Sequence, residues 1–329
     1  MSKNKFTLPL AALLLIFGLA ACAKTSGDAN ADNTTPPADD RLSVVVTNFP
    51  EYDFVRQITG DKADIVMLLK PGAESHSYEP TPQDILAIQN SDLFVYVGGE
   101  SDAWVEGILE SMDQSTMHLF KLMDCVEVYE EELVEGMQAE EEEEEAAGEE
   151  EEGPELDEHV WTSPVNAGEI VSALCDTLVT LPGADKEAFE ANKTAYLDKL
   201  RQLDADFREV VSTAKRKEII VGDRFPFRYF CEEYGLSYYA AFPGCATETE
   251  ANPATVAFLT DKVKEDGIPV VFHIELSNEQ MAASIAEATG AKSELLNAVH
   301  NVTDADFKAG LGYLEFMNRN VEALREALN

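Results

Sequence analysis

Short apolar runs alternate with stretches of helical periodicity along the first part of the chain. The runs 42–47, 63–69 and 93–97 are rich in Val, Ile and Leu and have the length of buried strands. The helix expected between the last two begins with Thr81 and Pro82, a capping residue followed by a proline that fits the first turn. Strands that alternate with helices in this order predict right-handed βαβ units and a parallel sheet.

A second set of alternating elements is expected after residue 217. Strands are expected at 218–221, 237–241, 269–274 and near 295–296, and helices at 226–234, 253–266, 278–289 and 312–328. Between the two sets, residues 185–217 carry apolar residues in steps of three, four and seven, which predict one amphipathic helix. At about 1.5 Å per residue it would be roughly 45–50 Å long, enough to cross two domains.

The predicted fold class is therefore α/β, with two parallel-sheet lobes joined by one long connecting helix. The N-terminal lobe is expected to comprise residues 42–184, the connecting helix 185–217, and the C-terminal lobe 218–329. A ligand site is expected in the cleft between the lobes, because the carboxyl ends of parallel strands gather loops there.

The N-terminus has the pattern of an export signal with a lipid attachment site. Residues 1–21 combine a short basic start with an apolar stretch too short to span a bilayer comfortably, and they end in Leu-Ala-Ala before Cys22. We expect Cys22 to be lipidated and residues 22–41 to be a flexible tether. The protein is then predicted to be extracytoplasmic, lipid-anchored to the outer face of the cell membrane or periplasmic.

The charge is strongly acidic and locally concentrated. The formal net charge is −39, which argues against nucleic acid as a partner and is compatible with cations. Acidic residues make up 18 of the 32 residues from 127 to 158. The simplest interpretation of residues 130–156 is a disordered acidic insert, and the alternative is a weak cation concentrator.

Three of the five histidines stand in loops with other polar groups. His76 lies between a strand and a proline-rich turn, His159 follows the acidic insert, and His300 follows the last short strand. His118 and His273 are better explained as structural. Imidazoles drawn from distant segments suit a four- or five-coordinate site for Zn²⁺, with Mn²⁺ as the alternative.

These segments resemble a known family. GAESHSYEPTPQD around His76 and DEHVWTSP around His159 are similar to the ligand segments of the zinc and manganese solute-binding proteins of ABC transporters, the ZnuA/TroA-like group. The resemblance covers essentially the whole chain after the tether. It implies that His76 and His159 are metal ligands from the first lobe and that His300 is the last ligand from the second.

At one ligand position the sequence differs from the family pattern. Arg224 stands where the family has its third ligand, and a guanidinium has only donors, so it cannot coordinate a cation. Asp223 or Glu275 is a possible fourth ligand in its place, and three protein ligands with a water are the alternative.

The implied function is capture of Zn²⁺, with Mn²⁺ as the alternative, and delivery to a membrane ABC permease with its cytoplasmic ATPase. The chain is expected to be a monomer and not an enzyme. The alternatives are a zinc-dependent hydrolase using the same histidines, and a metal-stabilised surface adhesin. Cys125, Cys175, Cys231 and Cys245 permit two disulfides, among them a Cys231–Cys245 bridge, and include no C-x-x-C pair.

Overall fold

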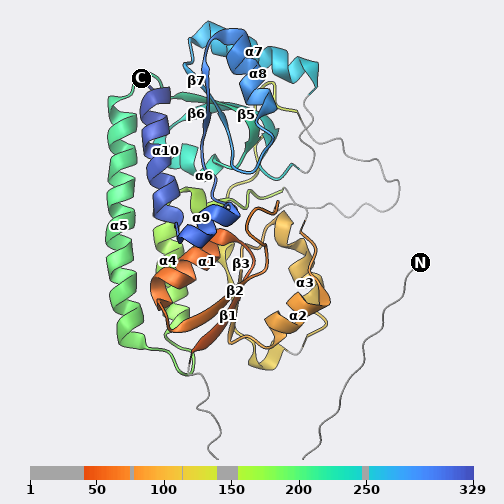
Figure 1. The fold of residues 1–329 in the computed structure, drawn as a ribbon, viewed down its shortest axis with the longest axis vertical. Coiled ribbons are helices and arrows are strands. Elements are labelled where there is room, and N and C mark those ends of the chain that lie inside the picture. Colours follow the sequence, from red (N-terminus) through yellow and green to blue (C-terminus); the bar gives the residue numbers. More distant parts are fainter. Residues whose placement is uncertain (1–40, 75–77, 113, 139–154, 247–251) are drawn as a thin grey trace, which may run out of the picture. The chain divides into compact units, whose positions relative to one another are not determined.

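Two separate four-stranded parallel sheets form the framework of the protein (Figure 1). The computed structural model describes residues 41–329 except 75–77, 113, 139–154 and 247–251. The first sheet has the strand order β2-β1-β3-β4 and the second the order β6-β5-β7-β8. The expected α/β class with two parallel sheets is therefore confirmed.

The first sheet forms from the apolar runs that the sequence pattern identified. Its strands are β1 (Leu42–Val46), β2 (Ala63–Met67), β3 (Leu93–Tyr96) and β4 (Leu119–Lys121), and the accompanying helices are α1 (Phe49–Thr59), α2 (Pro82–Gln89), α3 (Ala103–Leu109) and α4 (Pro164–Leu178). The start of α2 is as expected: the Thr81 hydroxyl accepts the Asp84 N–H and the Asp84 carboxylate accepts the Thr81 N–H. The sequence pattern missed β4 and α3, because elements of three and seven residues carry too little periodicity.

The second sheet has the same arrangement. Its strands are β5 (Glu218–Phe225), β6 (Ser237–Pro243), β7 (Val270–His273) and β8 (Lys292–Leu295), and the helices are α6 (Arg228–Tyr234), α7 (Pro253–Asp266), α8 (Gln280–Thr289), α9 (Asp304–Ala309) and α10 (Tyr313–Ala327). The short helix α9 was not expected. β5 extends four residues beyond its expected end, and its pairing with β6 is irregular between Val221 and Arg224.

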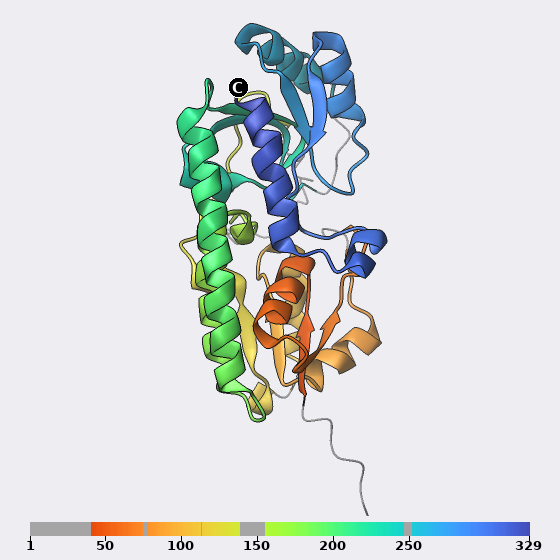
Figure 2. The same ribbon diagram turned by 60° about the vertical axis from the view of Figure 1, so that its left-hand side comes forward.

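The long helix α5 (Lys186–Thr213) connects the two sheets (Figures 1 and 2). Its 28 residues span about 42 Å. The expected apolar stripe is buried except for Leu197, which is partly exposed: Phe189, Tyr196, Leu200, Leu203, Phe207, Val210 and Val211. The stripe packs on α4 and α1 from the first lobe and on α10 and α6 from the second, so that one continuous core includes residues of both lobes. This packing fixes the distance between the strand ends that carry the histidines.

Within the described residues, no helix has both the length and the apolar character that a membrane span needs. The export signal, Cys22 and the tether lie outside the described residues, and so does the centre of the acidic insert.

Candidate metal centre

His159 is a fully buried imidazole that a carboxylate holds in one orientation. Its Nδ1 lies 2.9 Å from Asp157 Oδ1, and the same oxygen accepts the His159 backbone N–H at 2.8 Å. The Tyr229 hydroxyl donates to the Asp157 carbonyl at 2.6 Å and fixes the segment further. A neutral imidazole that donates its Nδ1–H to a carboxylate carries its lone pair on Nε2, the atom that binds a metal.

His300 has the same kind of support from the second lobe. Its Nδ1 lies 3.4 Å from Glu275 Oε1, and the Glu275 carboxylate accepts the backbone N–H groups of Ala298 at 2.7 Å and His300 at 2.8 Å. The residue between them, Val299, has a φ of 65°, which is costly for a β-branched side chain. The carboxylate therefore holds a strained turn in place so that His300 keeps its position.

The two imidazoles meet although they are far apart in the sequence. Their ring centroids are 4.7 Å apart with the planes at 81°. Trp161 packs edge-on against both rings, with centroids 5.6 Å from His159 and 5.5 Å from His300, and its Nε1–H donates to the Ala298 carbonyl at 2.8 Å. The indole thus forms a rigid apolar wall behind both rings.

The pKa values of the two histidines shift in opposite directions. Burial opposes the charged form of His159, but the Asp157 carboxylate holds the pKa of this imidazole above its usual range. Burial lowers the pKa of His300 below its ordinary value, and the nearby His159 and Arg224 act in the same direction. A lowered pKa favours the neutral form of His300, the form in which an imidazole binds a metal.

Asp223 and Glu275, the possible fourth ligands, both have their carboxylates bound to the backbone. Asp223 accepts the N–H of Arg224 at 2.9 Å and that of Ile274 at 3.3 Å. Glu275 faces the Nδ1 of His300, the side of the ring opposite to a coordinating Nε2. Burial alone would raise the pKa of Glu275, but the hydrogen bond with His300 and the backbone N–H groups keep it below its ordinary value.

Arg224 occupies a buried position next to His300. Its guanidinium forms an ion pair with Glu74 of the first lobe at 2.9 Å and donates to the Ala246 carbonyl at 3.2 Å. Both residues of the ion pair line a cavity of about 20 Å³ that Glu275 and His300 also line. A positive charge thus lies next to His300, close to where the family resemblance leads one to expect a third ligand.

His76 lies outside the described residues, but the start of its loop is tied to the segment that carries His300. The Asn301 side chain donates to the carbonyls of Lys70 and Ala73, both at 2.8 Å, and the Gly72 N–H donates to the Val302 carbonyl at 2.8 Å. The chain three residues before His76 is therefore anchored one residue after His300.

The two histidines interpreted as structural have other surroundings. His118 is exposed, and His273 lies 3.1 Å from the Ser293 hydroxyl through its Nδ1. The four cysteines Cys125, Cys175, Cys231 and Cys245 are free thiols, so the Cys231–Cys245 bridge is not formed.

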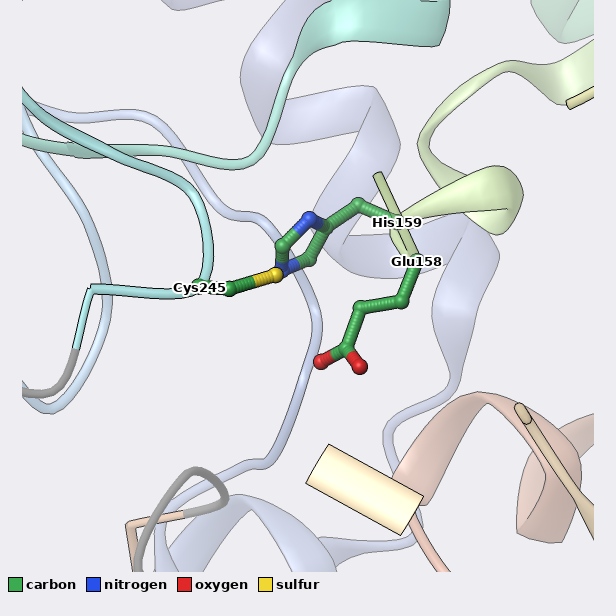
Figure 3. A group of neighbouring side chains, drawn as sticks. All are labelled: Glu158, His159 and Cys245. Carbon is green, nitrogen blue, oxygen red and sulfur yellow. The ribbon is translucent and has the colours of Figure 1, made fainter. Parts of the chain in front are cut away.

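Sequence reasoning missed two residues beside His159. One ligand atom each of Glu158, His159 and Cys245 lie within 4.8 Å of one another, and all three residues are buried (Figure 3). Gly244, next to Cys245, allows this approach, since a Cβ there would lie 2.8 Å from the His159 ring. No C-x-x-C or C-x-H sequence motif indicates the cluster of Glu158, His159 and Cys245. Cys245 follows β6 and is 86 residues away in the sequence from His159.

Comparison with known proteins agrees with this architecture. The family described as "Zinc-uptake complex component A periplasmic" (ZnuA) matches residues 44–327. The high-affinity zinc uptake system protein ZnuA of Bacillus subtilis is 35% identical over 310 residues, which cover 94% of this chain and 93% of that protein. The zinc-binding lipoprotein AdcA of Streptococcus pneumoniae is 33% identical over 323 residues, and the chain spans only 61% of its length.

A solved structure extends the comparison to the fold. The Zn(II)-bound ZnuA-like domain of Streptococcus pneumoniae AdcA superposes with a TM-score of 0.71 at 30% identity, covering 88% of this chain and 99% of that domain. The match thus includes both sheets and the helix between them. The chain belongs to the ZnuA family of zinc-uptake components.

Proposed function

We propose that this protein is the extracytoplasmic solute-binding component of an ABC importer, that it captures Zn²⁺ between its two lobes, and that it delivers the ion to a membrane permease. The observation that carries the proposal is the pair of buried imidazoles, His159 and His300, each braced by its own carboxylate and contributed by a different lobe. Metal-binding histidines in proteins have this support, since it fixes the tautomer and the ring orientation. The family membership and the zinc named in the relatives' descriptions point the same way.

We propose His76 as the third imidazole, because its loop is anchored by Asn301 next to His300. Asp157 and Glu275 are then the residues that orient His159 and His300, and neither needs to contact the ion. Asp223, whose oxygens accept two backbone N–H groups, has a structural role in this proposal. Zn²⁺ is favoured over Mn²⁺ because nitrogen donors and a low coordination number suit zinc.

The helix α5 limits how far the two lobes can move apart during binding and release of the ion. A helix of 28 residues that packs on both lobes resists a wide hinge motion. Binding and release therefore proceed through small tilts and loop movements. Lipidation of Cys22 would hold the protein at the membrane face, where the permease is its partner.

Competitive titration of the purified protein with Zn²⁺ tests this proposal. The native protein is expected to bind one tight equivalent, and His300→Ala and His76→Ala are expected to lose it. His118→Ala is the matched control, because His118 is an exposed histidine away from the described cluster. Several weak equivalents that are insensitive to all three substitutions would mean that the acidic residues 127–158 bind the metal, and would refute the site.

A further inference from the structure

Cys245 is a buried thiol beside the proposed metal site. It follows β6, and its Sγ lies within 4.8 Å of a ligand atom of His159 and of a carboxylate oxygen of Glu158. Figure 3 shows the thiol directed at the imidazole ring, with the Glu158 carboxylate below both in this view. Nitrogen, sulfur and oxygen donors thus converge on one point.

A second group of acidic residues gathers around the same sulfur. Carboxylate oxygens of Glu100 and Glu155 also lie within 4.8 Å of Cys245 Sγ and of each other. Within the described residues, the thiol is the one group shared by both clusters. Three carboxylates around one sulfur create a strongly negative potential, which favours a cation at this position.

The backbone on both sides presents this thiol to His159. Gly244 packs against the imidazole edge so closely that a side chain there would collide with it. The Cys245 N–H donates to the Glu131 carboxylate at 3.1 Å, which ties the turn after β6 to the first residues of the acidic insert. The position of the sulfur is therefore set by two contacts that do not involve the sulfur itself.

The Nδ1 of His159 is turned to Asp157, so a cation bound by His159 lies on Nε2. That cation is the same one that His300 is proposed to hold, because one imidazole lone pair binds one ion. Arg224 offers no lone pair at the position where the family resemblance places a third ligand. The three imidazoles proposed as ligands are then one donor short of the four that zinc prefers.

We infer that Cys245 is a ligand of the transported cation and takes the place of the coordinating residue that Arg224 cannot supply. The inference rests on the proposed function, since it concerns the same ion. On binding, the thiol gives its proton to solvent as the metal–sulfur bond forms. A thiolate in the donor set makes the site softer, so it favours Zn²⁺ over Mn²⁺ more strongly than imidazoles and carboxylates alone would.

The Cys245 thiol fits a role in which it is charged only with the metal present. Burial raises the pKa of the Cys245 thiol well above its ordinary value, and Glu158 and Glu131 act in the same direction. A raised pKa favours the neutral thiol while no metal is bound.

Co²⁺ substitution tests the inference directly, because a thiolate bound to Co²⁺ gives a charge-transfer band in the near ultraviolet that nitrogen and oxygen ligands do not give. The Co²⁺ complex of the native protein is expected to show the band, and Cys245→Ser is expected to lose it. Cys231→Ser is the matched control: Cys231 is also a buried free thiol, lies in α6 and belongs to neither cluster, so the band should persist.

Affinity provides the second measurement. Zn²⁺ affinity is expected to fall at least about tenfold in Cys245→Ser, since residues that only orient a ligand already contribute 10–100-fold. Mn²⁺ affinity should change much less. Tight Zn²⁺ binding by the native protein without a cobalt–thiolate band, or a band that Cys245→Ser retains, would overturn the inference and leave the proposed function standing. Absence of a tight Zn²⁺ equivalent in the native protein would overturn both.

Discussion

Glu275→Gln is a sensitive test of how the second lobe positions its histidine. The Glu275 carboxylate accepts the N–H groups of Ala298 and His300 and lies against the His300 Nδ1, so three donors share two charged oxygens. A glutamine amide keeps one carbonyl oxygen and replaces the other with an NH₂ group, which cannot accept a hydrogen bond. At least one buried donor is then left without an acceptor.

The contacts of Glu275 set the expected loss of stability and of Zn²⁺ affinity in Glu275→Gln. A hydrogen bond to a charged group contributes about 1.5–3 kcal/mol, and a buried donor without a partner costs about 1–3 kcal/mol. The strained φ of 65° at Val299 is then held less firmly. We expect Glu275→Gln to lower the free energy of unfolding of the metal-free protein by about 2–4 kcal/mol, and to weaken Zn²⁺ binding about 10–100-fold, as for other residues that orient a metal ligand.

Urea unfolding without metal and Zn²⁺ competition with a chelator measure the two effects separately. Glu279→Gln is the matched control, because Glu279 is an exposed glutamate in the segment that follows the same strand. A Glu275→Gln protein with native stability and native Zn²⁺ affinity would refute the orienting role. Native stability with weakened affinity would instead make Glu275 a direct ligand.

Two further predictions concern buried charged residues. Burial, with the nearby Asp102, raises the pKa of Glu51 from 4.5 to about 8, so the folded state binds this proton more tightly than the unfolded state. The stability due to the protonated carboxyl is complete below pH 4.5 and is lost as the pH rises towards 8, and Glu51→Gln should flatten the dependence of the urea midpoint on pH across that window. An unchanged slope would show that Glu51 is ionised in the folded protein. Arg224→His removes a positive charge beside His300 and adds an imidazole, so Zn²⁺ affinity should rise about tenfold in the same chelator assay. Arg224→Lys keeps the charge and serves as the control, and equal affinities of the two variants would contradict this explanation.

The sequence was sufficient for most of the framework because its signals are local. Short apolar runs identify β1, β2 and β3, and the stripe from Phe189 to Val211 identifies α5, since burial of one helix face requires that spacing. Thr81 marked the start of α2 because its side chain can accept a hydrogen bond from an N–H group of the first turn. A strand of three residues such as β4 depends on its neighbour for pairing, so its own residues gave no sign of it.

His159 and His300 were recognisable as candidates from the sequence because each stands in a loop among polar residues, and His76 remains a prediction from the same pattern. Only the tertiary structure decided what surrounds them. Asp157 lies two residues from its histidine, but Glu275, Cys245 and Arg224 reach the centre from three different segments of the second lobe. These three residues come together only through the packing of the sheets, α5 and the loops. Periodicity and capping are local patterns, so they do not predict that packing. The sequence by itself thus determined the elements and the imidazoles, while the packing of the two lobes determined which carboxylates orient those rings and placed a thiol beside one of them.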